Sequence, residues 1–144
     1  GSIHIRSPEP REYPAIRYNF LSNPFDRETL LAVTRKTREL MDAPALKEFR
    51  GAELAPGPGV QSDDEFLEWI KATAETTYHP VGTCKMGSDP MAVVDDQLRV
   101  HGMEGLRVAD ASIMPTLTSG NTNAPSIMIG EKAATMVLEA ARHA

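Results

Sequence analysis

His79 is the residue of this sequence best suited to moving a proton at neutral pH. An unperturbed imidazole titrates nearer to pH 7 than other side chains, so it can take or give a proton there. Pro80 follows it directly, and Gly82 and Gly87 lie on either side of Cys84 in the same stretch. Because proline disfavours helical backbone in the residue before it, His79 is expected on a stiff, non-helical segment. Such a segment suits a base that faces a substrate, although a single histidine after a helix is also a common structural residue.

A second group of polar residues lies between a predicted strand and a predicted helix. Asp110 follows the alternating segment 106–108, and Asn121 precedes Asn123, which is a good N-cap. A helix N-terminus presents free N–H groups and partial positive charge, so it can hold an anion or a ring that gains negative charge. The Asn121 amide offers a hydroxyl both a donor and an acceptor. His79 and Asn121 around one hydroxyl would form an alcohol-oxidising site, in which histidine removes the proton and the amide orients the oxygen.

Alcohol oxidation also needs a hydride acceptor, and the sequence has no motif that would bind one. The Gly-x-Gly-x-x-Gly of dinucleotide sites and the Gly-rich phosphate loop are both missing. The spacing of His79 and Cys84 matches no standard pattern of metal ligands. A nucleophilic role for Cys84 is weakly supported, since a small buried cysteine is the usual case. No Gly-x-Ser-x-Gly elbow indicates a serine hydrolase. The acceptor is therefore expected from outside this sequence.

Length and composition limit the remaining function classes. The chain has 144 residues, about one domain, and 41% of them are hydrophobic, enough for a core. A net charge of -5 argues against nucleic acid or an anionic membrane surface as the main partner. No apolar run is long enough to cross a bilayer. A single cysteine excludes an internal disulfide and a cysteine-based zinc cluster.

The first half of the sequence predicts one short strand and two helices. Alternating Ile and polar residues indicate a strand within 2–7, and three prolines favour extended backbone over 8–24. Asp26 is the expected N-cap of a helix over 27–42, which Pro44 stops. The loop 51–59, with its Pro and Gly residues, is either the wall or lid of a pocket or a plain connector.

A capping box predicts the start of a second helix. Patterns in the last third of the sequence predict a pair of strands and a third helix. Ser62, with Glu65 three residues later, starts a helix to about residue 76 that leads to His79. Segments 98–100 and 106–108 alternate and predict two strands. Apolar residues at helical spacing predict a helix from about 124 to 141 with Asn123 as N-cap.

Several long motifs, in order, resemble the C-terminal part of the glucose–methanol–choline (GMC) flavin oxidoreductases. The resemblance is almost continuous from Tyr78 to about Leu138, and Gly1 to Ser7 is similar to the strand that opens this region in the family. The residues that carry it are 78–87 (Tyr-His-Pro-Val-Gly-Thr-Cys-Lys-Met-Gly), 94–95, 98–102, 105–115, 120–125 and 128–133.

The resemblance implies an α+β fold and a two-lobed flavoprotein, of which this chain is the C-terminal part. Residues 1–105 would belong to a substrate lobe built on an antiparallel sheet and would include the histidine loop. Residues 106–144 would give the last strand and helix of a Rossmann-like FAD lobe.

The resemblance also implies roles for individual residues. His79 matches the catalytic base of the family, and Asn121 matches its second active-site position. Tyr78 would line the substrate pocket. The residues that would approach the FAD are Asp110, Ala111, Asn123, Ala124 and Pro125. The implied reaction is oxidation of a primary alcohol to an aldehyde, with His79 taking the hydroxyl proton and hydride passing to flavin N5.

The N-terminal half of the family pattern, with its Gly-rich dinucleotide loop, is missing from this sequence. The implied partner is that half of the same protein, expected as a separate chain, and without it we expect neither FAD binding nor turnover. Two alternatives stay open. One is a non-redox FAD-containing lyase of the same fold, similar to the hydroxynitrile lyases, and the other is a non-catalytic fragment that packs against a partner chain.

Overall fold

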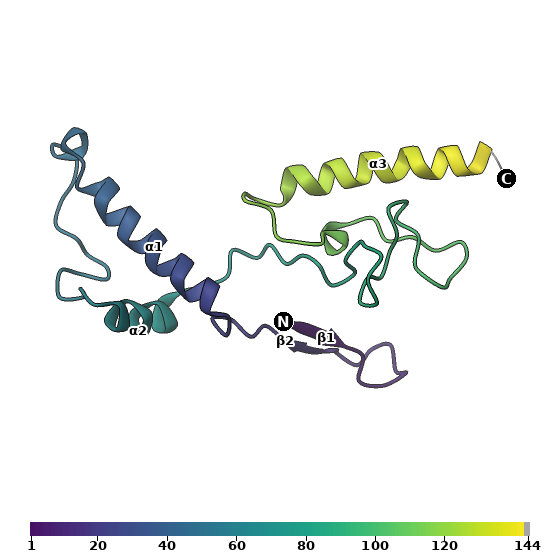
Figure 1. Cartoon of the computed structure of the whole chain (residues 1–144), viewed down its shortest axis with the longest axis horizontal. Coiled ribbons are helices and arrows are strands. Elements are labelled where there is room, and N and C mark those ends of the chain that lie inside the picture. Colours follow the sequence, from purple (N-terminus) through teal and green to yellow (C-terminus); the bar gives the residue numbers. More distant parts are fainter. Residues whose placement is uncertain (143–144) are drawn as a thin grey trace. The chain divides into compact units, whose positions relative to one another are not determined.

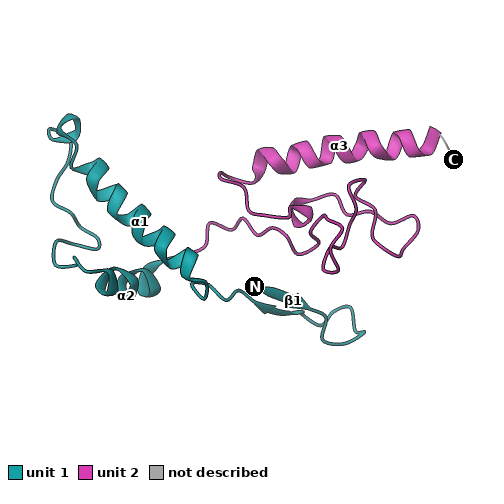
Figure 2. Cartoon of the chain, in the orientation of Figure 1, with its two compact units in different colours: residues 1–75 teal, residues 76–144 magenta. Residues whose placement is uncertain are grey.

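The computed structural model of the chain describes residues 1–142 (Figure 1). The chain forms two compact units, Gly1–Glu75 and Thr76–Ala144 (Figure 2). Helices and a small antiparallel sheet occupy separate segments, as the α+β prediction requires. The predicted lobes 1–105 and 106–144 refer to a complete two-lobed flavoenzyme, so that division stays a prediction.

The first unit opens with a two-stranded antiparallel sheet. β1 (Ser2–His4) pairs with β2 (Ala15–Arg17), and Ile3 lies opposite Ile16. The strand predicted within 2–7 is therefore present but shorter, and the predicted extended stretch contains its partner. The Tyr18 and Phe20 rings stack after β2 with their centroids 5.0 Å apart, and both remain exposed.

The first helix, α1 (Pro24–Met41), begins two residues before the predicted cap. The N-cap is Asn23, whose side chain accepts the Phe25 N–H at 3.0 Å, and not Asp26. Pro24 explains the shift, because proline is pre-organised for the first helical position and loses no hydrogen bond there. Asp26 instead lies in the first turn, where its charge suits the helix dipole. A short 3-10 turn, η1 (Pro44–Leu46), follows α1.

The second helix, α2 (Asp63–Thr73), has the predicted capping box. The Ser62 hydroxyl accepts the Glu65 N–H, and the Glu65 carboxylate accepts the Ser62 N–H at 2.9 Å. The helix ends three residues earlier than predicted, because Ala74 adopts extended backbone. Phe66 and Ile70 are buried and form the small core of this unit with Leu31 of α1.

Arg38 connects α1 to the loop that precedes α2. Its guanidinium lies 4.6 Å over the Phe66 ring and donates two hydrogen bonds to the Glu53 carboxylate from Nε and Nη2, at 3.0 and 2.8 Å. It also donates to the Gly57 and Val60 carbonyls at 2.9 and 2.7 Å. These bonds fix the predicted loop 51–59 against α1 within the first unit.

The second unit contains β-bridges where two strands are predicted. Residues 98–100 and 106–108 do pair antiparallel, through the bridge between Arg99 and Arg107. The Val100 N–H donates to the Leu106 carbonyl at 3.0 Å and the Val108 N–H to the Leu98 carbonyl at 3.1 Å, but the pairing is too short to form regular strands. The prediction of two regular strands is therefore wrong. The Asp95 carboxylate accepts the Gln97 and Arg99 N–H groups, each at 2.9 Å, in the turn next to this pairing. Leu98 has a left-handed φ of 63°, which turns the chain where a strand would run straight.

The core of the second unit lies beneath the long helix α3 (Asn123–Arg142). This helix matches the predicted span 124–141. It packs on the short 3-10 turn η2 (Ala111–Ile113) and on the bridged segments. The buried core residues are Val94, Leu98, Ile113, Met114, Ile129 and Ala133. Within residues 1–142, no helix combines the length and the apolar character needed to traverse a membrane.

The N-cap of α3 differs from the prediction. Helical residues begin at Asn123, and the Ser126 N–H donates to the Thr122 carbonyl at 3.0 Å. An N-cap residue is the one whose carbonyl accepts the first intrahelical bond. Thr122 therefore caps the helix, and Asn123 is its first residue. Asparagine and threonine both favour this position, so the sequence could not distinguish them.

Candidate active site

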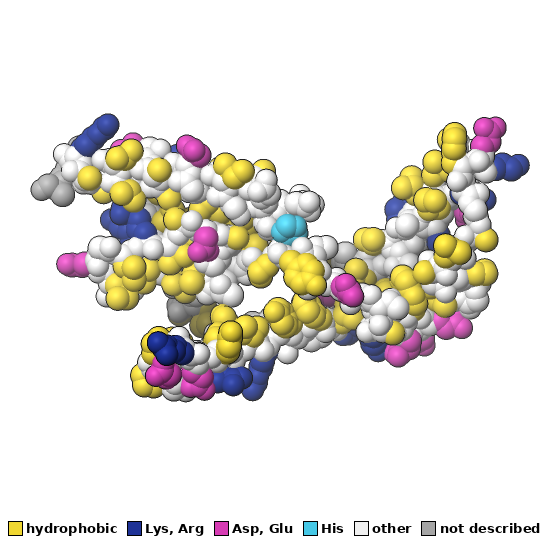
Figure 3. All heavy atoms as spheres, turned by 180° about the vertical axis from the view of Figure 1, so that it is seen from behind, with side chains coloured by type: hydrophobic (Ala, Val, Ile, Leu, Met, Phe, Trp, Pro, Cys, Tyr) yellow, Lys and Arg dark blue, Asp and Glu magenta, His cyan; other side chains and the backbone are white. Residues whose placement is uncertain are grey.

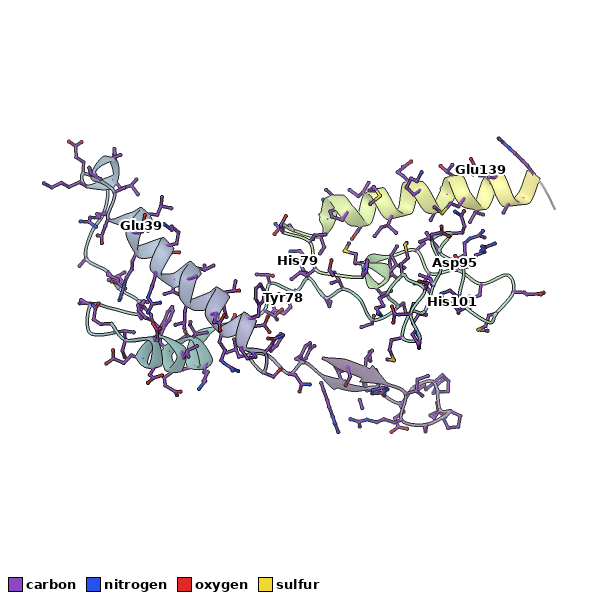
Figure 4. The ribbon with its side chains drawn as sticks, viewed as in Figure 1. Glu39, Tyr78, His79, Asp95, His101 and Glu139 are labelled. Atoms are coloured by element: carbon purple, nitrogen blue, oxygen red, sulfur yellow. The ribbon has the colours of Figure 1, made fainter. Side chains whose placement is uncertain are left out.

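The imidazole of His79 is held by the residue that caps α3. His79 Nδ1 lies 2.7 Å from Thr122 Oγ1, and Thr122 is 8% exposed. Figure 4 shows His79 beside the segment that leads into α3. The histidine loop and the start of the last helix, each predicted to bear chemistry, are therefore joined by a side-chain hydrogen bond.

The backbone around His79 is non-helical, as Pro80 predicts. Tyr78 has a left-handed φ of 59°, an unfavourable conformation for a tyrosine that costs on the order of 1–3 kcal/mol. Its N–H donates to Thr76 Oγ1 at 3.1 Å. Gly82 has a φ of 82°, which glycine adopts without strain. The Tyr78 side chain is 78% exposed, so its predicted place in a pocket wall depends on further residues.

Two backbone hydrogen bonds anchor the rest of the loop to η2. The Cys84 N–H donates to the Ser112 carbonyl at 2.9 Å, and the Met86 N–H donates to the Ile113 carbonyl at 2.7 Å. Because Ile113 is in the buried core, these bonds tie the loop to the core of the unit. Cys84 is partly buried and free.

Asn121 lies next to the residue that holds His79. It is exposed, whereas Thr122 is buried, so the two neighbours face different surroundings. Asn121 is thus open to solvent, while the Thr122 hydroxyl contacts the His79 ring. The structure brings both predicted catalytic residues to one region of the second unit.

Asp110 caps the 3-10 turn η2. Its Oδ1 accepts the Ser112 N–H at 2.7 Å. The Ser112 hydroxyl and backbone N–H together hold the pKa of this carboxyl below its usual range. Asp110 is therefore an anion at neutral pH, and it remains an exposed acceptor. Ala111 follows it at the first position of η2 and is half-buried.

The remaining predicted cofactor residues form the first turn of α3. Asn123 and Ala124 are exposed and Pro125 is half-buried. The helix N-terminus therefore lies open beside the His79–Thr122 pair. In residues 1–142 no group of three or more His, Cys, Asp or Glu side chains could hold a metal ion.

The described grooves of this unit lie away from His79. One, of about 460 Å³, is lined by Gln97, Arg99, Arg107 and the last turns of α3. Another, of about 390 Å³, surrounds the turn at 99–107. Neither includes His79 or Asn121.

Large apolar side chains are exposed on both units, as Figure 3 shows. α3 buries Ile129 and Ala133 but exposes four apolar side chains on its other faces, namely Ile127, Met128, Val137 and Leu138. A helix that is apolar around most of its circumference is normally covered on more than one side. This exposure agrees with a chain that packs against further protein.

Thr122 is the site residue that the sequence analysis missed. It lies between two asparagines that each had an assigned role, and a threonine before a helix is an ordinary cap. The only available signal was its position beside Asn121. Its contact with His79 depends on the tertiary fold.

Comparison with known proteins identifies the family. The sequence profile of the GMC oxidoreductases, for their C-terminal region, matches residues 1–130. The chain is 55% identical over 134 residues to the oxygen-dependent choline dehydrogenase of Pseudomonas aeruginosa (strain LESB58). The matched region covers 93% of this chain and 24% of that protein. It thus spans about a quarter of the length of such relatives.

Solved structures give the same result. An FAD-dependent oxidoreductase from Chaetomium thermophilum superposes with a TM-score of 0.90 at 30% identity, covering 97% of this chain and 24% of the other. A fungal aryl-alcohol oxidase superposes with a TM-score of 0.83 at 35% identity, covering 96% of this chain and 23% of the other. The motifs that resembled this family, the fold and the sequence profile agree: the chain belongs to the GMC oxidoreductase family.

Proposed function

We propose that this chain supplies the proton-removing wall of a flavin-dependent site that oxidises a primary alcohol to an aldehyde. The observation that carries the proposal is the fixed His79 ring, bonded through Nδ1 to the cap of α3 beside the exposed Asn121. The names of its relatives, a choline dehydrogenase and an aryl-alcohol oxidase, favour an alcohol substrate.

The division of labour follows from the two side chains. With Nδ1 engaged by Thr122, Nε2 is the His79 nitrogen left to take the proton of a substrate hydroxyl. The Asn121 amide orients the same oxygen by hydrogen bonding. The Tyr78 ring, exposed on the preceding residue, lines the space that the substrate occupies.

The residues near the α3 N-terminus fit one edge of an FAD. When bound, FAD supplies the hydride acceptor, N5, that this chain lacks. The first turn, Asn123 to Pro125, presents the N–H groups of Asn123 and Ala124 and partial positive charge to a ring edge that gains negative charge. Asp110 and Ala111 lie on η2, which packs on α3, and approach the same cofactor.

The rest of the cofactor site lies outside this chain. The sequence has no Gly-rich dinucleotide motif, and α3 exposes apolar side chains that suit coverage by further protein. The proposed partner is the N-terminal FAD-binding half of the enzyme, which completes a two-lobed flavoprotein.

The test uses a chimera in which this chain replaces the matching segment of the Pseudomonas aeruginosa relative. Variant His79→Ala is expected to lower kcat by about 10²–10⁴, the usual contribution of a general base. His4→Gln is the matched control, because His4 is exposed in β1, outside the second unit. A His79→Ala enzyme within about threefold of wild type would remove His79 from the role of base.

Flavin reduction separates the oxidase from a lyase of the same fold. Anaerobic addition of a primary alcohol should bleach the flavin of the chimera. A chimera that binds FAD and cleaves a cyanohydrin, yet is not bleached by any alcohol tried, would contradict the oxidation and indicate the lyase. A folded chimera with neither activity would indicate a non-catalytic segment.

A further inference from the structure

We infer that Thr122 is a positioning residue that fixes the tautomer of His79, so that the proton sits on Nδ1 and Nε2 is the basic atom. This inference rests on the proposed function, because it specifies which nitrogen of the proposed base reacts. It assigns a role to a residue that touches neither the substrate nor the cofactor in the proposal.

The Thr122 hydroxyl has few ways to move. Thr122 is a polar residue that is buried, with only 8% of its surface exposed. Its carbonyl accepts both the Ser126 N–H at 3.0 Å and the Ser126 hydroxyl at 2.7 Å. The cap backbone is therefore fixed by α3, and the hydroxyl is presented to His79 from a rigid element. On the other side, the histidine loop is tied to the buried Ile113 through Met86.

A neutral histidine has one protonated and one unprotonated ring nitrogen, and the partner of one nitrogen sets the state of the other. If Nδ1–H donates to Thr122 Oγ1, the Nε2 lone pair is free to accept a substrate proton. The resulting imidazolium keeps the Nδ1–H bond to the same oxygen. The contact therefore suits His79 before and after it takes the proton.

The opposite direction of the bond would disable the base. If the Thr122 hydroxyl donated to Nδ1, Nε2 would carry the proton and could only donate to a substrate oxygen. The ring would then have to exchange its tautomer before every turnover. The contact distance alone allows both directions, so a measurement of the proton position decides between them.

The decisive measurement is the ¹⁵N chemical shifts of the His79 ring in the 144-residue chain, read by NMR at a pH where the ring is neutral. We expect the Nδ1–H tautomer in the wild type and in Thr122→Ser, which keeps a hydroxyl. In Thr122→Val, which has nearly the same shape but no hydroxyl, the ring should shift to the Nε2–H tautomer that free histidine favours. Thr135→Val is the matched control, because the Thr135 hydroxyl is exposed on the same helix and bonds only to the Glu131 carbonyl.

A mainly Nε2–H tautomer in the wild type would overturn the inference, as would an unchanged tautomer in Thr122→Val. Both results concern only the tautomer of the ring. Whether His79 is the base is tested separately, by the turnover of the His79→Ala chimera.

Kinetics of the chimera give a second, independent readout. Thr122→Val should lower kcat by about 10–100-fold, the usual cost of losing a partner that orients a functional histidine. KM should change by less than about threefold, because Thr122 does not touch the substrate, and Thr122→Ser should restore most of kcat. A loss confined to KM, or no rescue by serine, would show that Thr122 acts through packing and would overturn the positioning role.

Discussion

His79 and Thr122 are 43 residues apart in the sequence, yet their side chains meet at 2.7 Å. The bond joins the loop that carries the proposed base to the cap of the last helix. Figure 4 shows that His79 and His101, both in the second unit, lie at different places in it, and the His101 ring instead contacts the Gly87 carbonyl at 3.0 Å. His79 is thus held by a side chain at the start of a helix, whereas His101 contacts a backbone carbonyl.

The 144-residue chain alone should not retain FAD. In the proposed function it contributes only one edge of the cofactor site, and the rest comes from the N-terminal half. Equilibrium dialysis against FAD should therefore leave the purified chain colourless, whereas the chimera should copurify with flavin. Stoichiometric yellow flavin bound to the isolated chain would contradict this prediction and the proposed partner.

Replacing Gly82 by alanine should destabilise the histidine loop. Gly82 has a φ of 82°, and a Cβ there would lie 3.2 Å from the Met114 carbonyl oxygen. A left-handed alanine costs about 1–2 kcal/mol, before that contact is counted. Amide hydrogen exchange over residues 80–87 should report faster opening.

The matched control is Gly130→Ala, inside α3, where a Cβ would meet nothing within 4 Å. Alanine should there stabilise the helix by about 0.5–1 kcal/mol. Equal effects at the two positions would show that the left-handed backbone of Gly82 is not what matters.

Arg38→Lys should loosen the first unit although it keeps the charge. A lysine cannot reproduce the fork that contacts Glu53, Gly57 and Val60 at once, nor lie flat over the Phe66 ring. We expect a loss of about 1–3 kcal/mol, because partly buried carbonyls and a carboxylate lose their donor. Faster exchange of the α2 amides would measure it.

Lys36→Gln provides the comparison for Arg38. Lys36 pairs with Glu39 on the exposed face of α1, with both side chains about 70% exposed. Exposed pairs of this kind contribute about 0.2–1 kcal/mol at most. If the two variants destabilise the unit equally, the network around Arg38 has no special role.

Acid should weaken the capping box of α2. The Ser62 and Gln61 backbone N–H groups, followed by the Ser62 hydroxyl, hold the pKa of Glu65 below its usual value of 4.5. Because the pKa is lower in the folded chain than in the unfolded one, this contribution is complete above about pH 4.5 and is lost as the pH falls through the folded value. Urea unfolding of α2 should therefore show wild-type stability decreasing on acidification below pH 4.5.

Glu65→Gln isolates this effect, since glutamine can still accept the same N–H groups but does not titrate there. Its stability should be lower than that of the wild type near neutral pH, and the difference should shrink in acid. Parallel pH profiles of the two proteins would assign the acid sensitivity to other carboxylates.

The helices are the part of the fold that local sequence determines best. The capping box of α2 and the apolar spacing of α3 are satisfied within a few residues, so neighbouring side chains are enough to predict them. The two N-cap errors, Asp26 for Asn23 and Asn123 for Thr122, have the same origin. In both cases two acceptable capping residues lie within one turn, and a proline nearby makes either start possible.

The strands are where local patterns misled. Segments 98–100 and 106–108 alternate as strands do and they pair, but only through the single bridge between Arg99 and Arg107. The left-handed backbone of Leu98, with a φ of 63°, turns the chain at the start of the first segment, and hydrophobic alternation contains no information about that turn.

By itself, the sequence determined the chemistry that is available and the family. A histidine before a proline, an asparagine before a helix and the order of the surrounding motifs are all readable from the residues. Only the tertiary structure decided that the ring partner of His79 is Thr122 and not Asn121. That choice depends on where the core anchors the loop at Met86 relative to the α3 cap, and no local propensity encodes a distance between segments so far apart in the chain.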